Sequence, residues 1–198
     1  MAGLQTICNK LSKNVSSAYC NTSGGTTGRQ WVFQKPQLAG GATYNNTGAL
    51  SSFTLKTGEK GIKANGKAKK GSGASAISTG ENGGVVNAQT VVSQFKYQTG
   101  LEAKALMEFM RADGKIVFQE TAKGTIRVYF WNFGSEGGSA TDGTGTGLLD
   151  PNDEFIATIT GEDTELPLFF EVALEDGETD QLKASATYLD SLTLADPA

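Results

Sequence analysis

The chain has 198 residues, with 26 glycines, 4 prolines and a formal net charge of −4. This length suffices for a domain with a sizeable core, and abundant glycine without a collagen period is typical of a turn-rich β protein. With no histidine and two cysteines, the usual zinc sites and the commonest catalytic machinery are excluded. No apolar run is long enough to predict a transmembrane helix.

The first 28 residues are predicted to form a polar N-terminal arm, because they are rich in Ser, Thr, Asn and Gly. The opening stretch MAGLQTICNKLSKN lacks a basic segment followed by an apolar core. We therefore expect no signal peptide, and synthesis in a cytoplasm. Cys8 and Cys20 are then either free thiols or, as the alternative, a disulfide that closes the arm.

The next apolar residues alternate, which predicts short strands. Gln30 to Lys35 places Trp31 and Phe33 on one face, and the stretch ALSSFTLKTG from Ala49 forms a second strand. Residues 56–84 contain almost no apolar side chains. We expect them to form a long basic loop or a solvent-exposed hairpin.

Regular structure is predicted again from Val85. Alternating β-branched residues indicate a strand to Gln98, and the pair Thr99 and Glu102 forms a capping box that begins a helix over residues 100–113. Gly114 suits the end of that helix. A hairpin follows, with strands over residues 115–121 and 125–133.

The last third contains a glycine-rich segment, residues 134–153, that is typical of a linker or loop. Two strands are expected around the turn GEDTELP, and a final strand over residues 181–194. The predicted fold is therefore mainly β: an antiparallel β-sandwich or open barrel with one flanking α-helix and long loops. We expect residues 1–198 to form a single domain.

Charge is unevenly distributed along the chain. Residues 1–135 contain 16 Lys or Arg against 6 Asp or Glu, whereas residues 136–198 contain 1 Lys against 15 acids. The two halves either neutralise each other within one sandwich or create one basic and one acidic surface. The second arrangement favours head-to-tail association between copies.

The stretch GIKANGKAKKGSG, from Gly61, matches the spacing G-x-x-x-x-G-K of a phosphate-binding loop. Ala68 stands where Ser or Thr would bind magnesium, and no helix-forming run follows, so nucleotide binding is not expected. The lysines remain, and we interpret them as a solvated surface, a protein docking arm or a nucleic-acid contact. No aromatic residues interleave with them for base stacking.

Catalysis and metal binding have weak support. The acids Glu162, Asp163 and Glu165 share one turn, which is typical of a solvated turn and not of a catalytic carboxylate pair. The stretch DPNDE from Asp150 lacks the spacing of a calcium-binding loop. We therefore predict no enzyme activity and no cofactor.

The segment from Val91 to Glu171, with TITGEDTELP at Thr158 to Pro167, resembles tail-tube-like virion proteins of tailed bacteriophages of the Bacteroidetes type. The resemblance implies a subunit that self-assembles into stacked rings, through which DNA passes without specific binding. It also implies location in the virion tail, assembly in the host bacterial cytoplasm, and contacts with other tail or head-connector proteins. No membrane anchor is expected.

Opposed charge predicts a subunit interface between a basic and an acidic group of residues. Its members are Lys60, Lys63, Lys67, Lys69 and Lys70 on one side, and Glu162, Asp163 and Glu165 on the other. The alternative function is a head-decoration, connector or fibre module that binds a surface or carbohydrate. Its candidate sugar platforms are Trp31, Tyr44, Tyr129 and Trp131.

Overall fold

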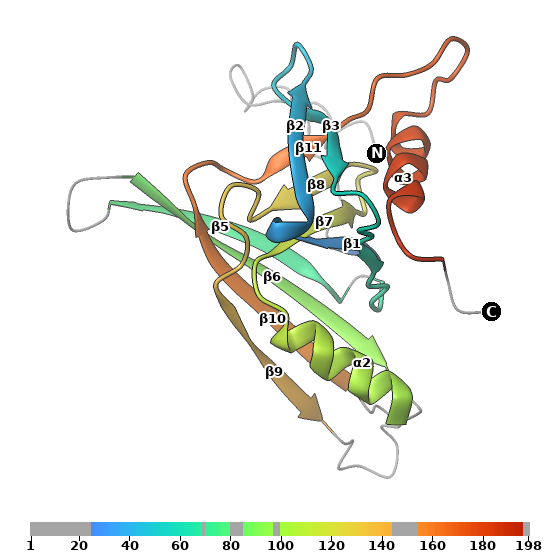
Figure 1. Ribbon diagram of the computed structural model, residues 1–198. Coiled ribbons are helices and arrows are strands. Elements are labelled where there is room, and N and C mark those ends of the chain that lie inside the picture. Colours follow the sequence, from blue (N-terminus) through green and yellow to red (C-terminus); the bar gives the residue numbers. More distant parts are fainter. Residues whose placement is uncertain (1–24, 69, 80–84, 97–99, 144–153, 196–198) are drawn as a thin grey trace, which may run out of the picture.

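The computed structural model describes residues 25–68, 70–79, 85–96, 100–143 and 154–195. They form two stacked sheets with open edges, two α-helices and one short 3₁₀ helix (Figure 1). One sheet has seven strands in the order β2-β3-β11-β8-β7-β1-β4, and the other has four in the order β5-β6-β10-β9. The predicted mainly β fold is confirmed as an open sandwich that does not close into a barrel.

The bounds of the seven-stranded sheet are β1 Thr26–Gln34, β2 Leu38–Tyr44, β3 Leu50–Leu55, β4 Ile62–Lys63, β7 Lys115–Thr121, β8 Ile126–Tyr129 and β11 Leu168–Phe170. Those of the four-stranded sheet are β5 Ser72–Thr79, β6 Val85–Lys96, β9 Gly137–Gly143 and β10 Glu154–Asp163. The helices are η2 Lys35–Gln37, α2 Gly100–Arg111 and α3 Gln181–Ser191. All strand pairs are antiparallel except β11 with β3, which meet in parallel at Phe170 and Leu50.

Strand alternation divides the core into two apolar clusters. Trp31 and Phe33 of β1 face the cluster that α3 covers, whereas Val32 between them faces the cluster enclosed by the two sheets and α2. The first cluster is strongly aromatic, with the rings of Phe53 and Phe118 stacked at 5.3 Å between centroids. Burial of each such side chain stabilises the fold by about 1.5–3 kcal/mol.

The helix predicted over residues 100–113 is confirmed as α2, and Gly114 ends it with a positive φ of 64°. The capping residue Thr99 lies outside the described residues. Only part of the predicted apolar face packs, because Phe109 is buried while Leu101 is 78 % exposed. The helix therefore sits on the sheet by its C-terminal half.

The predicted final strand is wrong, because residues 181–191 form the helix α3. Asp180 caps this helix by accepting a hydrogen bond from Lys183 N at 2.9 Å, and Ala186 and Leu189 are buried beneath it. The protein thus has two flanking α-helices, where one was expected. The predicted linker also contains a strand, β9. The last residues of the predicted polar arm belong to β1, which begins at Thr26.

Candidate functional site

One face of the four-stranded sheet is largely open, although Gln94 on it is buried, and we call it the outer face. In β6 and β10 the odd-numbered residues point into the sandwich and the even-numbered ones point outward, as the buried Val91, Phe95 and Ile159 show. The outer face consists of Ser72, Ala74, Ala76, Ser78, Val86, Ala88, Thr90, Val92, Gln94, Gly137, Ser139, Thr141, Ile156, Thr158, Thr160 and Glu162.

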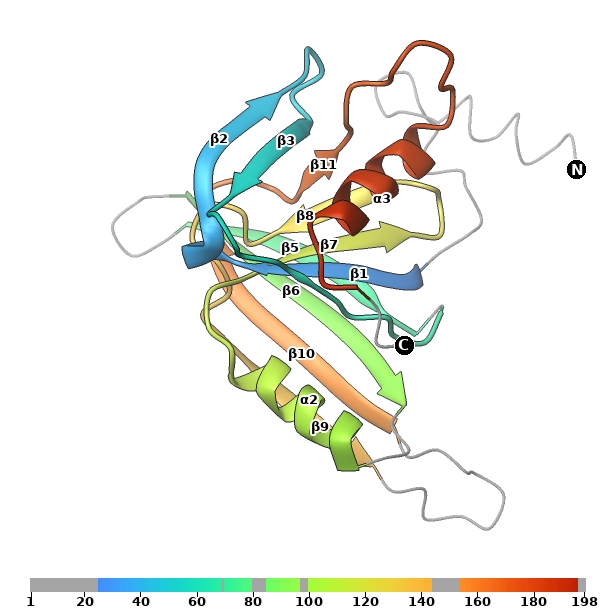
Figure 2. The same cartoon turned by 45° about the vertical axis from the view of Figure 1, so that its right-hand side comes forward.

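The residues named for the outer face are mostly small and uncharged. Among the residues just named, Glu162 alone carries a charge. The opposite face of the same sheet is covered by α2, where Phe109 packs on Phe95 at 5.9 Å between ring centroids, and by the seven-stranded sheet (Figure 2). One face of the four-stranded sheet is therefore covered by other elements, whereas most of the outer face is not.

Both edges of this sheet are open in the described part of the chain, since β5 and β9 each pair with one strand only. All eight residues of β5 are exposed, and its sequence SGASAIST contains no lysine, proline or bulge. Natural proteins usually protect a long edge strand with such features, because unpaired N–H and C=O groups attract another strand. Along its free side, β5 therefore presents backbone N–H and C=O groups that pair with no described strand.

The hairpin of β5 and β6 extends beyond the body of the protein (Figure 1). Ile77 and Val85 belong to the inward-facing series, yet they are 63 % and 61 % exposed because nothing in the described chain covers them. Closer to the body of the protein, the segment after β10 lies against this hairpin, because Gln89 Nε2 donates a hydrogen bond to the carbonyl oxygen of Glu165 at 2.8 Å. The projecting tip thus carries two apolar side chains that none of the described residues buries.

Part of the predicted basic loop is bound to the C-terminal end of α3 and the residues that follow it. Lys60 Nζ donates to the carbonyl oxygen of Ser191 at 2.8 Å, and Lys63 Nζ lies 3.5 Å from Asp190 Oδ1. Gly61 forms backbone hydrogen bonds with Leu192 and Leu194. These cations stabilise the C-terminal end of α3, where carbonyl groups carry partial negative charge.

The remaining predicted lysines have mixed positions. Lys67 is half-buried and its backbone N–H donates to the carbonyl oxygen of Gln94, while Lys70 is exposed. Lys69 lies outside the described residues, as do Cys8 and Cys20. Beyond Lys70 the segment continues as the exposed strand β5, which pairs with β6 and so with residues that follow the predicted loop.

The predicted acidic turn is only partly exposed. Asp163 is buried and accepts hydrogen bonds from Asn132 N at 3.0 Å and Asn132 Nδ2 at 2.7 Å, so the expectation of a solvated carboxylate is wrong for this residue. Glu162 and Glu165 are exposed, as expected. Glu162 belongs to the outer face, whereas Glu165 lines a groove beside β11, so the turn does not present one acidic patch.

The aromatic residues proposed as sugar platforms are mostly internal. Trp31, Tyr129 and Trp131 are buried, and Trp131 Nε1 donates to Tyr44 Oη at 3.1 Å. Tyr44 alone among the four is substantially exposed, at 50 %. The structure therefore contradicts an aromatic carbohydrate platform made of these side chains.

The chain was compared with protein-family models, curated proteins and solved structures. None of them matches it. Within the described residues, no helix has the length and apolar character needed to cross a membrane, and no group of three or more His, Cys, Asp or Glu is placed to hold a metal ion. The open four-stranded sheet is thus the candidate functional site.

Proposed function

We propose that the protein is a structural virion subunit that self-assembles into rings, and that these rings stack into a bacteriophage tail tube. The observation that carries this proposal is the four-stranded sheet, with two open edges, of which β5 is unprotected, and a smooth outer face. The role requires assembly and no catalysis. The resulting location is the virion tail, in contact with other tail or head-connector proteins.

Strand direction supports closure of the sheet into a ring. Because the sheet has four antiparallel strands, β5 and β9 at its two edges run in opposite directions. Rotation about a ring axis preserves these directions, so β9 of one copy meets β5 of the next as an antiparallel neighbour. Such a head-to-tail contact closes into a ring when the rotation does, and it leaves no free edge.

The shape of each copy supports one orientation in this ring. The seven-stranded sheet and α2 form the thicker layer. In a ring this layer fits on the outside, because the circumference is larger there. The outer face of the four-stranded sheet then points toward the axis. DNA phosphates are held chiefly by Lys and Arg, and the outer-face residues named above include neither. The register places Lys96, of the same even-numbered series, opposite the acidic Glu154, so the face suits a conduit that lets DNA pass.

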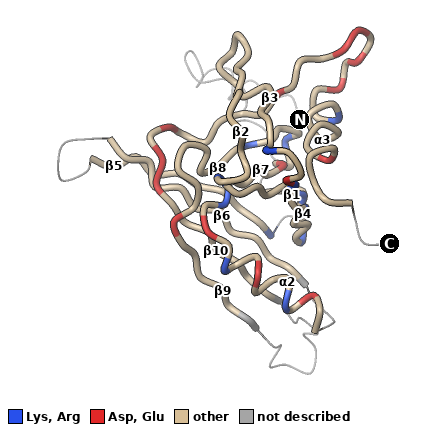
Figure 3. Tube along the Cα trace, viewed as in Figure 1, with Lys and Arg blue, Asp and Glu red and all other residues tan. Residues whose placement is uncertain are grey.

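Opposed charges give the proposed stacking a direction. Acidic residues gather in the loop that precedes α3, including Glu175, Asp176 and Glu178, as Figure 3 shows. The exposed Lys70 remains a predicted contact for such acids on a neighbouring copy, whereas Lys60 and Lys63 already bind α3. Salt should therefore weaken stacking more than it weakens ring closure.

Electron microscopy and light scattering of the purified full-length protein test the proposal. We expect rings or tubes that become more frequent as protein concentration rises. A protein that stays monomeric at millimolar concentration, or that forms only closed dimers, would overturn the proposal.

Two neighbouring variants locate the contact. In β5, the N–H groups of Ala74 and Ser75 point to opposite edges of the strand. Ala74→Pro and Ser75→Pro therefore differ in whether they remove a hydrogen bond to β6 or block the free edge. We expect one of the two to fold normally and fail to form rings, and assembly by both would exclude β5 from the contact.

A further inference from the structure

A groove interrupts the seven-stranded sheet between β3 and β11. The two strands meet at one residue pair, Phe170 and Leu50, and most residues that line the groove precede this pair in the two segments. The space between them has a volume of about 550 Å³. We call this space the notch, and it is lined by Thr47, Gly48, Ala49, Glu165, Leu166, Pro167, Leu168, Phe169 and Glu171.

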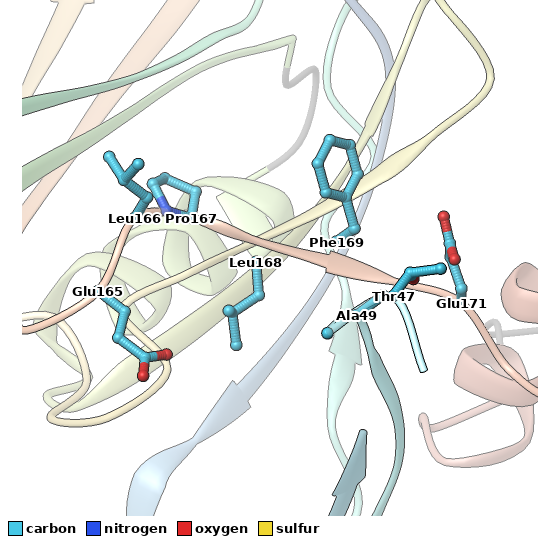
Figure 4. A pocket seen from close by; sticks show the side chains of 9 residues that line it. Thr47, Ala49, Glu165, Leu166, Pro167, Leu168, Phe169 and Glu171 are labelled. Atoms are coloured by element: carbon cyan, nitrogen blue, oxygen red, sulfur yellow. The ribbon is translucent and has the colours of Figure 1, made fainter. Parts of the chain in front are cut away.

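The notch combines apolar walls with two carboxylates. Leu166 is 52 % exposed and Phe169 is 42 % exposed, although both are large apolar residues (Figure 4). The Arg127 guanidinium stacks on the Phe169 ring at 4.2 Å and so fixes its orientation. Glu165 and Glu171 are the charged lining residues, so the chemistry favours a segment with apolar and basic side chains.

The first 24 residues of this chain have that chemistry. They contain Lys10 and Lys13 and no acidic residue, and apolar side chains recur at Leu4, Ile7 and Leu11. From the two lysines and the two carboxylates of the notch we infer that attraction between them would add specificity to apolar burial.

The position at which the described chain starts brings this segment within reach. Gly25 lies beside the turn between β7 and β8, since its carbonyl oxygen accepts a hydrogen bond from Ala122 N at 3.1 Å. From β1 to β11 the sheet order is β1, β7, β8, β11, which is three strand spacings or about 14 Å. The 17 residues from Cys8 to Gly25 span about 25 Å even as a flexible chain.

We propose that residues 1–24 bind in the notch of their own copy, with Leu4, Ile7 and Leu11 on the apolar wall and the two lysines beside Glu165 and Glu171. The inference concerns one copy of the chain and is independent of ring assembly. It gives the exposed Leu166 and Phe169 a partner. It also explains why a chain with an open groove on its largest sheet carries a basic, partly apolar segment at its N-terminus.

Cys8 provides a direct test in the full-length chain. In a Cys20→Ser background, Leu166→Cys places a thiol at the notch, and the matched control Leu101→Cys places one at the most exposed leucine of α2. Under mild oxidation we expect the intrachain disulfide with Cys8 to form on the order of tenfold faster at the notch than in the control. Equal rates, or a disulfide formed only between copies, would overturn the proposal.

A charge exchange separates specific binding from chance encounter. Lys10→Glu combined with Lys13→Glu should slow the notch disulfide several-fold, and Glu165→Lys with Glu171→Lys in the same chain should restore the rate. The control disulfide with Leu101→Cys should respond to neither change. If the exchanged charges do not restore the rate, the carboxylates of the notch do not recognise the segment.

Discussion

Gln89 Oε1 accepts a hydrogen bond from Phe130 N at 2.7 Å, and Phe130 has a positive φ of 62°. A side chain of the four-stranded sheet thus fixes a left-handed residue at the end of β8 in the other sheet. For a bulky residue this backbone conformation costs about 1–2 kcal/mol. The buried Phe130 ring and the Gln89 hydrogen bond together offset that cost and set how the two sheets lie against each other.

Loss of this hydrogen bond should destabilise the fold. We expect Gln89→Met, which keeps the side-chain length, to lower the free energy of unfolding by about 2 kcal/mol because the buried Phe130 N–H loses its acceptor. Urea denaturation measures the change. Thr90→Met, at the next position and on the outer face, is the control, and an equal effect of both variants would contradict the prediction.

A second prediction concerns Gly73 in β5. A Cβ at this position would overlap the Tyr129 hydroxyl and lie 2.8 Å from Gln119 Oε1, so β5 depends on glycine for its approach to the other sheet. We expect Gly73→Ala to cost about 1–3 kcal/mol and to speed amide exchange in β5. Gly137→Ala, in β9, meets no atom within 4 Å and is the matched control. Unchanged exchange in the first variant would show that β5 does not need this close approach.

Lys115 couples α2 to β7 and gives a pH-dependent prediction. Its buried Nζ donates to the carbonyl oxygens of Met110 and Ala112 at the C-terminal end of the helix. Burial lowers the pKa of Lys115 from the usual 10.5, and Asp113 partly opposes this effect. The unfolded chain therefore holds this proton more tightly, so Lys115 makes the free energy of unfolding rise with pH between its folded pKa and 10.5.

The comparison with Lys115→Met isolates this contribution. As the pH rises toward 10.5, the wild-type protein should gain stability relative to the variant, as measured by urea unfolding at a series of pH values. Lys104→Met, at an exposed position of α2, is the control and should show no such trend. A relative loss of wild-type stability with rising pH would contradict the assignment.

Asp190 anchors the C-terminal end of α3. It accepts a hydrogen bond from Trp31 Nε1 at 2.7 Å and lies within 3.5 Å of Arg29 and Lys63. Asp190→Ala should cost about 1–3 kcal/mol, because the indole N–H loses its acceptor. Asp190→Asn should cost under about 1 kcal/mol, since the amide oxygen still accepts and the ion pairs are partly exposed. Thermal melts of both variants check this order, and equal losses would show that charge matters more than the hydrogen bond.

Much of the fold was predictable wherever one apolar pattern dominated. The strand over residues 115–121 was located to the residue, and so was the beginning of α2. The helix α3 was mistaken for a strand because its apolar residues also fit an alternating pattern. Asp180, immediately before the helix, is a capping residue that could have indicated the correct structure.

Other features depend on partners that are distant in the chain. β9 is rich in Gly, Ser and Thr, and its pairing with β10 is what makes it a strand. Asp163 is buried because Asn132, 31 residues earlier, supplies donors for its carboxylate. The outer face emerged only when the register of four strands was known, since no single strand reveals that its neighbours also carry few charged residues.

The order of strands also bears on how the protein is made. β11 lies between β3 and β8 in the seven-stranded sheet. In the chain it follows β3 by more than a hundred residues and β8 by about forty. During translation, β2 and β3 must wait for a strand that leaves the ribosome late, and α3 covers the aromatic cluster later still. Chains cut short before Phe170 therefore lack the piece that joins the sheet. Truncated copies that cannot complete the seven-stranded sheet would therefore not enter a larger assembly.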